Sequence, residues 1–174
     1  MDFDELYHTH KNLVFNLALG YCQNKEDAEE ITQEVFLTVF EKQSQFEGNS
    51  SLSTWIYRIT VNKSLDYLKS KKRKKRSFLF KSLRLDDQNK SFEVPNFDHP
   101  GILLESKEAM RTIFAAINRL PDNQKTVILL LRLEEKTQAE TAEIMGTSIK
   151  AVESLYQRAK KNLKQFLIDP KDGN

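Results

Sequence analysis

The chain has 174 residues, a net charge of +2, 39% hydrophobic residues and 30% charged residues, so it can form one large or two small domains and is not a polycation. Its single cysteine, Cys22, excludes an internal disulfide and fits a reducing cytosol. The acidic N-terminus and the short apolar runs argue against a signal peptide and a membrane span, so we expect a cytoplasmic protein without direct membrane insertion.

Three helical patterns occupy the first part of the chain. Apolar side chains recur every three or four positions over residues 3–22. Asn24 is a suitable N-cap for a second helix. A polar turn at residues 46–51 precedes a third helix, which we expect over roughly residues 52–72. Together these helices predict a first domain over residues 1–76.

Charge is unevenly distributed over this first domain. Residues 25–47 contain seven acidic and two basic residues, whereas residues 69–81 contain eight basic residues and no acidic one. The acidic stretch can be a solvated helix face or a protein-docking surface. The basic run can be a solvated helix end, a flexible hinge or a contact for a DNA backbone. This separation predicts two kinds of partner surface.

The middle of the chain loses clear periodicity. Residues 77–102 contain two prolines and several small polar residues, which predicts a flexible linker with at most a brief helical piece near residues 78–85. A second domain is expected over residues 103–174. It starts with an amphipathic helix that includes residues 110–120, and the Leu-Pro-Asp sequence that ends this helix begins a deeply apolar one.

The last part of the second domain has the pattern of a helix-turn-helix DNA reader, although an ordinary amphipathic hairpin is an alternative. Thr137 and Glu140 predict a capping box at the start of a short helix. Gly146 can adopt positive φ in the turn, and Ser148 can cap a longer helix with one apolar and one polar, basic face. The packing face of the short helix is predicted to consist of Ala139, Ala142 and Met145.

No catalytic constellation is recognisable in the sequence. His8 and His10 are two positions apart on a predicted helix and point to different faces, whereas a metal-binding pair needs a spacing of four. Phosphate-binding, dinucleotide-binding, nucleophile-elbow and Cys-x-x-Cys motifs are also missing. We therefore expect no enzyme activity, no catalytic residue, no metal site, no cofactor and no small-molecule substrate.

Four motifs follow one another over nearly the whole chain: Asp27–Phe36, Phe46–Asn62, Leu65–Lys69 with the basic run, and Leu120–Gln124 with the helix-turn-helix. In this order and spacing they resemble bacterial RNA polymerase sigma factors of the sigma-70 family, extracytoplasmic-function (ECF) subfamily. The resemblance implies an all-α fold with two small helical domains joined by a flexible linker, the C-terminal one containing the helix-turn-helix. It also implies a factor that binds the β′ and β subunits of core RNA polymerase, reads −35 and −10 promoter elements, opens the DNA and is bound by an anti-sigma factor.

The resemblance assigns three sets of contact residues. Docking on core polymerase is expected at Asp27, Glu30, Gln33 and Glu34. Recognition and melting of the −10 element are expected at Asn49, Ser50, Trp55, Tyr57, Arg58, Asn62, Lys63 and Lys69. Recognition of the −35 element is expected at Ser148, Lys150, Glu153, Ser154, Gln157, Arg158 and Lys161. The chemistry is suitable, because aromatic rings and amides can capture unstacked bases, although Trp55 can equally pack in a core.

Three residues depart from the family pattern. Thr141 stands where an apolar residue is usual, which predicts a slightly looser helix-turn-helix core. Glu153 can accept a hydrogen bond from a cytosine amino group, or it can pair with a neighbouring side chain. Asn49 replaces an acidic residue, which leaves the base preference of the −10 pocket open.

Two other classes of protein are compatible with parts of this pattern. A conventional dimeric helix-turn-helix regulator would read a palindrome, but it leaves the acidic helix and the Trp-containing segment without a role. A helical adaptor or sigma mimic that does not bind DNA leaves the basic recognition face without a role. A regulator binds promoter DNA alone, whereas a sigma factor is expected to require core polymerase.

Overall fold

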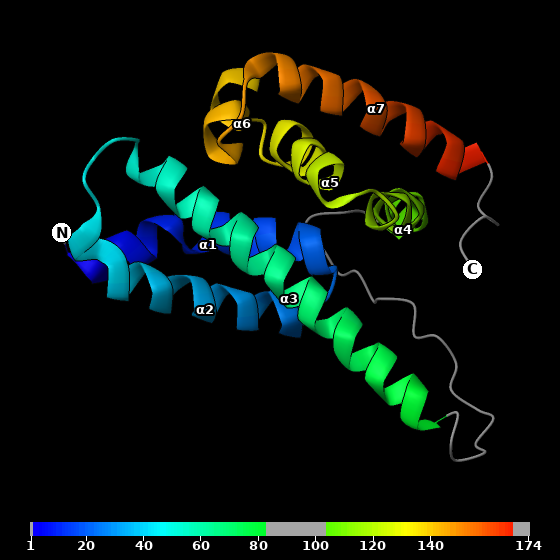
Figure 1. Ribbon diagram of the computed structural model, residues 1–174, viewed down its shortest axis with the longest axis horizontal. Coiled ribbons are helices and arrows are strands. Elements are labelled where there is room, and N and C mark those ends of the chain that lie inside the picture. The colour runs from blue at the N-terminus through cyan, green and yellow to red at the C-terminus, as the bar shows by residue number, and fades with distance from the viewer. Residues whose placement is uncertain (1, 83–103, 169–174) are drawn as a thin grey trace.

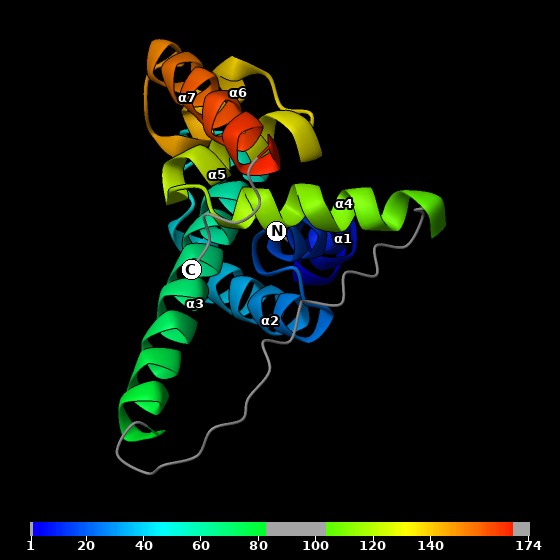
Figure 2. The ribbon, with the colours of Figure 1, turned by 90° about the vertical axis from the view of Figure 1, so that its right-hand side faces the viewer.

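The computed structural model describes residues 2–82 and 104–168, and every regular element in these ranges is a helix, as the sequence predicts. Figures 1 and 2 show α2 on the opposite side of α1 and α3 from α7, with α5 and α6 between. In chain order the elements are α1 (Phe3–Cys22), α2 (Lys25–Lys42), the 3-10 turn η1 (Gln43–Gln45), α3 (Leu52–Ser82), α4 (Leu104–Asn118), α5 (Asp122–Ile128), the π-helical turn η2 (Leu129–Leu133), α6 (Gln138–Met145) and α7 (Ile149–Ile168).

Local capping residues fix the boundary between α1 and α2. Gln23 ends α1 in a left-handed conformation with φ of 55°, and its backbone N–H donates to the carbonyl of Leu19 at 2.8 Å. Asn24 then caps α2 as predicted, because its side-chain oxygen accepts from the backbone N–H of Asp27 at 2.9 Å. The turn between the two helices is therefore short, and α1 and α2 pack side by side.

Helix α3 is longer than the sequence analysis predicted. It begins after Ser51, whose hydroxyl accepts from the backbone N–H of Thr54 at 3.0 Å, and it continues to Ser82 instead of ending near residue 72. The basic run is thus helical, and residues 77–82 of the expected linker belong to this helix. The physical reason is that Lys and Arg are good helix formers and α3 contains neither Gly nor Pro. The rest of the expected linker, residues 83–102, lies outside the described residues.

The helix-turn-helix forms as the sequence predicts. The Thr137 side chain accepts from the backbone N–H of Glu140 while the Glu140 carboxylate accepts from the backbone N–H of Thr137, which is a capping box. Gly146 ends α6 with φ of 62°, and Ser148 caps α7 by accepting from the N–H of Ala151 at 3.1 Å.

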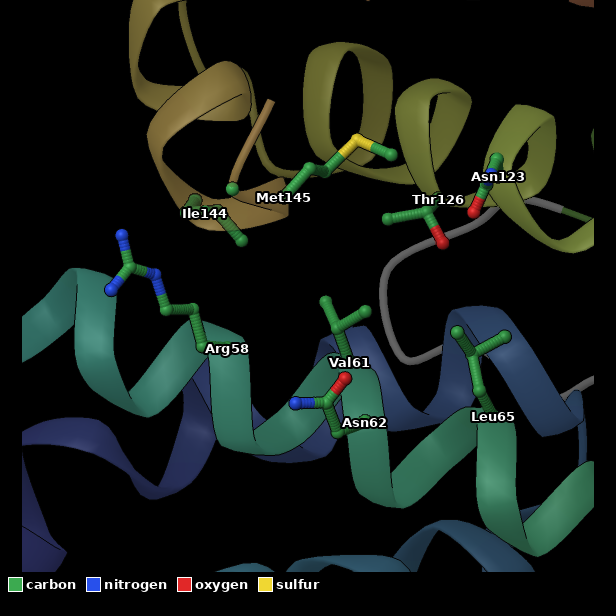
Figure 3. Close-up of a pocket in the computed structure, with 9 residues that line it drawn as sticks. Arg58, Val61, Asn62, Leu65, Asn123, Thr126, Ile144 and Met145 are labelled. Carbon is green, nitrogen blue, oxygen red and sulfur yellow. The ribbon is translucent and has the colours of Figure 1, made fainter. Parts of the chain in front are cut away.

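The predicted packing face of α6 is partly wrong. Ala139 is exposed, and the buried residues are Thr141, Ala142 and Ile144. The short helix therefore turns Ala142 toward α5 and α7, and the face with Ile144 toward α3 (Figure 3). The threonine hydroxyl has no hydrogen-bond partner in this core. The sequence showed Thr141 at a position where an apolar residue is usual. It did not show which side of this short helix is buried.

One hydrophobic core joins the two halves of the chain. Buried residues from α1, α2, α3, α4, η2, α6 and α7 belong to a single cluster. At its centre, the buried Tyr21 hydroxyl shares a 2.7 Å hydrogen bond with the Thr126 hydroxyl. Gly20 allows α1 to approach η2 closely, because a Cβ there would lie 2.8 Å from Leu133 Cδ2 and 3.0 Å from Leu129 Cδ2. The helices of the first half and of the second half are thus packed on each other.

Candidate nucleic-acid and polymerase interface

The acidic face of α2 is bound by side chains from α3. The Tyr67 hydroxyl donates to Asp27 at 2.8 Å and lies 3.2 Å from a carboxylate oxygen of Glu30. Lys71 also forms a salt bridge with Asp27. Desolvation and the two acidic neighbours raise the pKa of Tyr67, so its hydroxyl keeps its proton and remains a donor. These contacts hold two of the four predicted docking residues in fixed positions.

The other two predicted docking residues are exposed. Gln33 has no contact described, and Glu34 accepts from Lys63 at 3.3 Å in a salt bridge on the surface. Such a pair is worth little to stability and separates easily. The four residues Asp27, Glu30, Gln33 and Glu34 therefore form one face along α2, in which Asp27, Glu30 and Glu34 contact side chains of α3.

The turn before α3 surrounds a small polar pocket of about 170 Å³. Phe46 and Trp55 pack on one side with ring centroids 5.2 Å apart and planes 41° apart, so Trp55 is half-buried. Asn49, Ser50 and Arg58 contribute polar groups to the same pocket. The structure thus brings four of the predicted −10 residues together, and Trp55 packs on Phe46 while it also lines the pocket.

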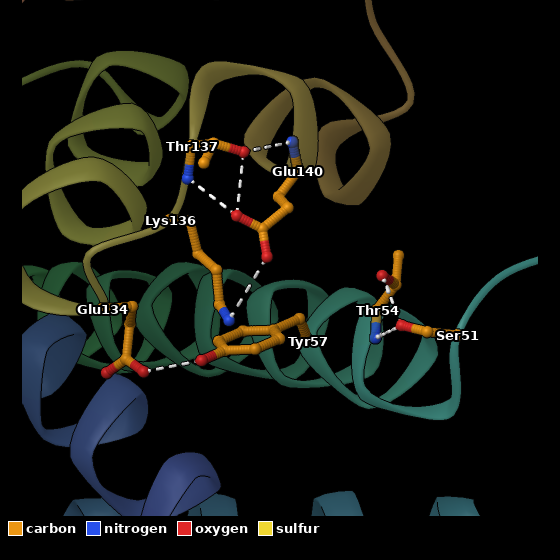
Figure 4. Close-up of polar contacts among 7 residues, drawn as sticks. All are labelled: Ser51, Thr54, Tyr57, Glu134, Lys136, Thr137 and Glu140. Atoms are coloured by element: carbon orange, nitrogen blue, oxygen red, sulfur yellow. Dashed lines mark hydrogen bonds and ion pairs between the residues drawn. The ribbon is translucent and has the colours of Figure 1, made fainter.

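Tyr57 does not lie on an exposed face of α3. It is buried, its hydroxyl donates to Glu134 at 2.8 Å, and the Lys136 ammonium lies 4.8 Å from its ring centroid (Figure 4). Desolvation raises the pKa of Tyr57, with the Glu134 charge as the next cause, and burial raises the pKa of Glu134 above its usual value. A ring in this position is available to a base only after Glu134 and Lys136 have moved away.

Arg58 and Asn62 face the second half of the chain. The Arg58 guanidinium donates twice to the backbone carbonyl of Glu143, at 2.7 and 3.1 Å. Arg58 and Asn62 also line a pocket of about 450 Å³ between α3 on one side and α5 and α6 on the other (Figure 3). The Asn62 side chain is exposed and makes no described hydrogen bond, so the amide predicted to meet a base is unoccupied at the edge of this pocket.

Two further predicted DNA-binding lysines lie on the outer face of α3. Lys63 pairs with Glu34, and the exposed Lys69 lies 4.0 Å from Asp66. Beyond them, residues 71–78 are all exposed on the part of α3 that projects from the helical body (Figure 2). This projecting segment carries most of the basic run and gives the surface a concentrated positive charge.

The exposed face of α7 presents all the predicted −35 residues. Val152 and Ala159 are buried on the opposite face, which orients the helix. Arg158 folds back on its own helix, with Nε 3.3 Å from the carbonyl oxygen of Ser154. Glu153 has no salt bridge within the described part of the chain, so the alternative of a paired Glu153 finds no support there. The exposed residues are Ser148, Lys150, Glu153, Ser154, Gln157, Arg158 and Lys161.

Sequence reasoning missed the residues that connect the candidate surfaces. Glu134 and Lys136 follow η2 and reach Tyr57 across more than seventy positions of sequence, which no local pattern encodes. Arg132 similarly donates to the hydroxyl of Tyr156 at 2.7 Å and holds η2 against α7. The sequence feature that could have indicated them is the cluster of charged residues at 132–136, directly after the apolar residues 127–131. Within residues 2–82 and 104–168, no helix is long and apolar enough to cross a membrane and no group of side chains is arranged to hold a metal ion.

The two halves of the chain match two parts of one family. The family model described as Sigma-70 region 2 matches residues 6–74, and the one described as Sigma-70, region 4 matches residues 110–163. The chain is 29% identical over 158 residues to an ECF RNA polymerase sigma-E factor of Haemophilus influenzae, covering 91% of this chain and 83% of that protein. It is 28% identical over 171 residues to the ECF RNA polymerase sigma factor SigW of Bacillus subtilis, and the match covers 96% of this chain and 89% of that protein.

Solved structures share the fold. The sigma factor RpoE of Bartonella quintana, in complex with the anti-sigma factor NepR, has a TM-score of 0.64 at 20% identity, and the match covers 97% of this chain and 98% of the RpoE chain. CnrH in complex with the cytosolic domain of CnrY has a TM-score of 0.65 at 20% identity, and the match covers 98% of this chain and 89% of CnrH. The protein therefore belongs to the sigma-70 family and is an alternative sigma factor of the ECF group, which directs RNA polymerase in the initiation of transcription.

Proposed function

We propose that the acidic face of α2 docks on core RNA polymerase, through Asp27, Glu30, Gln33 and Glu34. Charge and position support this assignment, because these side chains form one face of one helix, and Gln33 and Glu34 are exposed. The Tyr67 and Lys71 contacts give Asp27 a defined position before any partner arrives, which lowers the ordering cost of docking. The same face is remote from α7, so polymerase and the −35 element do not compete for it (Figure 1).

The exposed face of α7 reads the −35 element in this proposal. The observation that carries it is the combination of a capped α6, a glycine turn and an α7 whose polar face is entirely exposed. In this proposal one side chain, Lys161, meets a phosphate, and the residues that meet base edges in the major groove are Lys150, Glu153, Ser154, Gln157 and Arg158. Ser148 lies at the N-terminus of α7, where backbone N–H groups favour an anion such as a phosphate.

The start of α3 recognises and opens the −10 element. The pocket at residues 45–58 combines aromatic surface with small polar groups, which suits an extruded base. Asn62 offers an amide without a described partner, and Lys63 and Lys69 are placed to hold the backbone. Opening DNA by capturing bases needs no covalent chemistry, so we assign the chain no enzymatic activity and no cofactor.

The working units in this proposal are residues 1–76 for core docking and the −10 element, and residues 103–174 for the −35 element, joined by a linker over 77–102. We further propose an anti-sigma factor as a regulatory partner, since RpoE and CnrH have been crystallised with NepR and with the cytosolic domain of CnrY, respectively. The chain acts in the cytoplasm, where its polymerase is.

Run-off transcription from a promoter library tests this proposal most directly. Core polymerase with the purified chain is expected to transcribe a defined subset of promoters, whereas either component alone does not. Promoter binding by the chain alone, as a dimer on a palindromic site, would instead support a conventional helix-turn-helix regulator.

A further inference from the structure

The part of α3 that projects from the helical body is strongly basic. Residues 71–78, called here the basic segment, are all exposed, and positions 71–76 carry six consecutive cations. Lys71 bonds Asp27 of α2, and the residues after it lead away from α7 (Figures 1 and 2). The match to Sigma-70 region 2 ends at residue 74, whereas α3 continues to Ser82. The outer part of the basic segment therefore lies beyond the matched region, and the proposed function gives it no role.

The cations of the basic segment repel one another. Residues three and four positions apart are neighbours on a helix, so Lys72 lies beside Lys75 and Arg76. Like charges at these spacings destabilise a helix, and an exposed helix has little packing to offset them. The run of cations also ends before the last turn of α3, to which the favourable effect of the helix dipole is limited. An extended anionic surface is the kind of partner that offsets this repulsion.

A phenyl ring distinguishes between the anionic surfaces that could meet these cations. The Phe78 side chain is 56% exposed at the outer end of the basic segment. The backbone of a DNA duplex offers phosphates to the cations but no apolar surface to the ring. A membrane surface suits both groups, because lysine and arginine reach headgroup phosphates while aromatic rings lie at the level of the headgroups.

Phe78 is too far from the −10 pocket to stack on an extruded base there. The pocket is lined by residues 45–58, which include the first turns of α3. Phe78 lies on the same continuous helix as Trp55, and a rise of ~1.5 Å per residue places it roughly 35 Å farther along. A phospholipid surface is therefore the anionic partner that uses the exposed ring as well as the cations.

We propose that the basic segment of α3 binds an anionic phospholipid surface, with its lysine and arginine side chains at headgroup phosphates and the Phe78 ring among the headgroups. The contact is peripheral, because the helix lies on the surface and does not cross the bilayer. One aromatic ring with a cluster of cations gives weak, reversible attachment that salt weakens further. The inference goes beyond the proposed function and does not depend on it.

Co-sedimentation of the full chain with vesicles measures this attachment. Vesicles of phosphatidylglycerol and phosphatidylethanolamine supply an anionic surface, and vesicles of phosphatidylcholine supply a neutral one. At ~0.1 M salt the chain is expected to pellet with the anionic vesicles and to stay in solution with the neutral ones. Each cation near the anionic surface strengthens binding by about fivefold, so the attachment should also weaken as salt is added.

A triple variant with Arg73→Gln, Lys74→Gln and Arg76→Gln tests the cations. Its partition onto anionic vesicles is expected to fall about a hundredfold, from roughly fivefold for each cation removed. The three side chains are exposed and glutamine is a good helix former, so α3 should stay folded.

The matched control removes the same charge from α2 and α7. It replaces three exposed lysines with glutamine: Lys25, Lys42 and Lys164. This control is expected to bind anionic vesicles nearly as well as the parent, because these lysines lie outside the basic segment.

Phe78→Ala separates a lipid surface from nucleic acid. Loss of the ring is expected to weaken binding to anionic vesicles about tenfold, which corresponds to partial burial of a phenyl group. Any binding to a DNA duplex without promoter elements should be the same for this variant and the parent, because contacts to phosphates do not use the ring.

Three results would overturn the inference, provided that thermal unfolding shows all the chains to be equally folded. In the first, the parent stays in solution with anionic and neutral vesicles alike. In the second, the triple variant and its control lose vesicle binding equally, so that net charge and not the basic segment attracts the chain. In the third, Phe78→Ala binds vesicles like the parent, so that the segment meets any polyanion, duplex DNA included, through charge alone.

Discussion

The Tyr67 hydroxyl lies 2.8 Å from Oδ1 of Asp27, so a hydrogen bond links the helix that we assign to polymerase with the helix that we assign to promoter DNA. A second contact of the same hydroxyl, to Glu30, lies 3.2 Å away. Tyr67 therefore connects the two proposed partner surfaces.

Reversal of Glu30 and Glu34 to Lys is expected to weaken binding of core polymerase while the fold remains intact. Both side chains are exposed, and the salt bridge of Glu34 with Lys63 contributes no more than about 1 kcal/mol to stability. Binding to fluorescently labelled core polymerase and thermal unfolding measure the two effects. A double reversal at the exposed Glu5 and Glu108 changes net charge equally and should leave core affinity unchanged. Equal losses in both double variants would argue against a specific docking face.

Asn62→Ala is expected to impair promoter opening more than promoter binding. The side chain is exposed and makes no described hydrogen bond, and Ala is the better helix former, so the variant should fold as well as the parent. Open-complex formation on duplex promoters should fall, whereas a template with a pre-melted −10 region should restore most activity. Equal defects on both templates would point to a lost polymerase contact, and the assignment of Asn62 to strand opening would be wrong.

Thr141→Val is expected to stabilise the protein by about 1 kcal/mol, because the buried hydroxyl has no partner and valine has the same shape. Thr60→Val is the matched control, since Thr60 is also fully buried but its hydroxyl donates to the Ile56 carbonyl at 2.8 Å. The control should gain less or lose stability. Urea unfolding of the two variants measures this difference, and a destabilised Thr141→Val chain would mean that water satisfies the hydroxyl.

The free energy of unfolding is expected to rise with pH between about 8 and 9. Burial lowers the pKa of Lys125 from 10.5 to about 8, and the charge of Lys72 is the next cause. In this window the unfolded chain holds a proton on Lys125 that the folded chain lacks, so stability increases as pH increases. Above about 9 the raised pKa of the Cys22 thiol acts in the opposite direction, and above about 10 those of Tyr21 and Tyr57 do so too, since the folded state then holds more protons.

Lys125→Met isolates this contribution. Removing the buried charge is expected to stabilise the chain at pH 7 by on the order of 2–3 kcal/mol, at roughly 1.4 kcal/mol per pKa unit. The hydrogen bond from Lys125 to the exposed Asn118 is lost, but water can replace it. Chemical unfolding between about pH 8 and 9 should show the rise in the parent and no rise in Lys125→Met. A rise of the same size in both chains would assign the effect to another group.

The sequence predicted the local features of the fold because they depend on neighbouring residues. The Asn24 cap, the Thr137–Glu140 capping box and the Gly146 cap all involve residues at most four positions apart. The extent of α3 was underestimated because a run of like charges was taken as the end of a helix, although each residue in it favours helix.

The parts that the sequence did not predict depend on long-range packing. Tyr57 has a plausible DNA-stacking position in the sequence, yet it is buried by Glu134 and Lys136 from the other half of the chain. On α6, whether Ala139 or Ile144 faces the core depends on the approach of α3, and eight residues are too few to define a periodic stripe. The grouping of the predicted site residues on α2, the start of α3 and α7 did follow from the sequence, because each group lies on a single helix or turn.

Glu153 is the sharpest test of −35 recognition. It is exposed in the middle of α7, and no salt bridge within the described residues explains its presence. A carboxylate in the major groove can accept a hydrogen bond from a cytosine amino group, so Glu153→Ala is expected to relax base preference at one −35 position, at a cost of about 1–3 kcal/mol for the preferred base.

Lys161→Ala serves as the contrasting variant, because a phosphate contact carries no base preference. It should weaken binding across all promoters and lower the salt slope of holoenzyme binding by about one unit. Sequencing transcripts from a promoter library randomised over the −35 element distinguishes the two patterns, with thermal unfolding as a check on folding. If Glu153→Ala gives the parent's base profile, Glu153 does not read the promoter, and the polar face of α7 recognises DNA through its remaining residues.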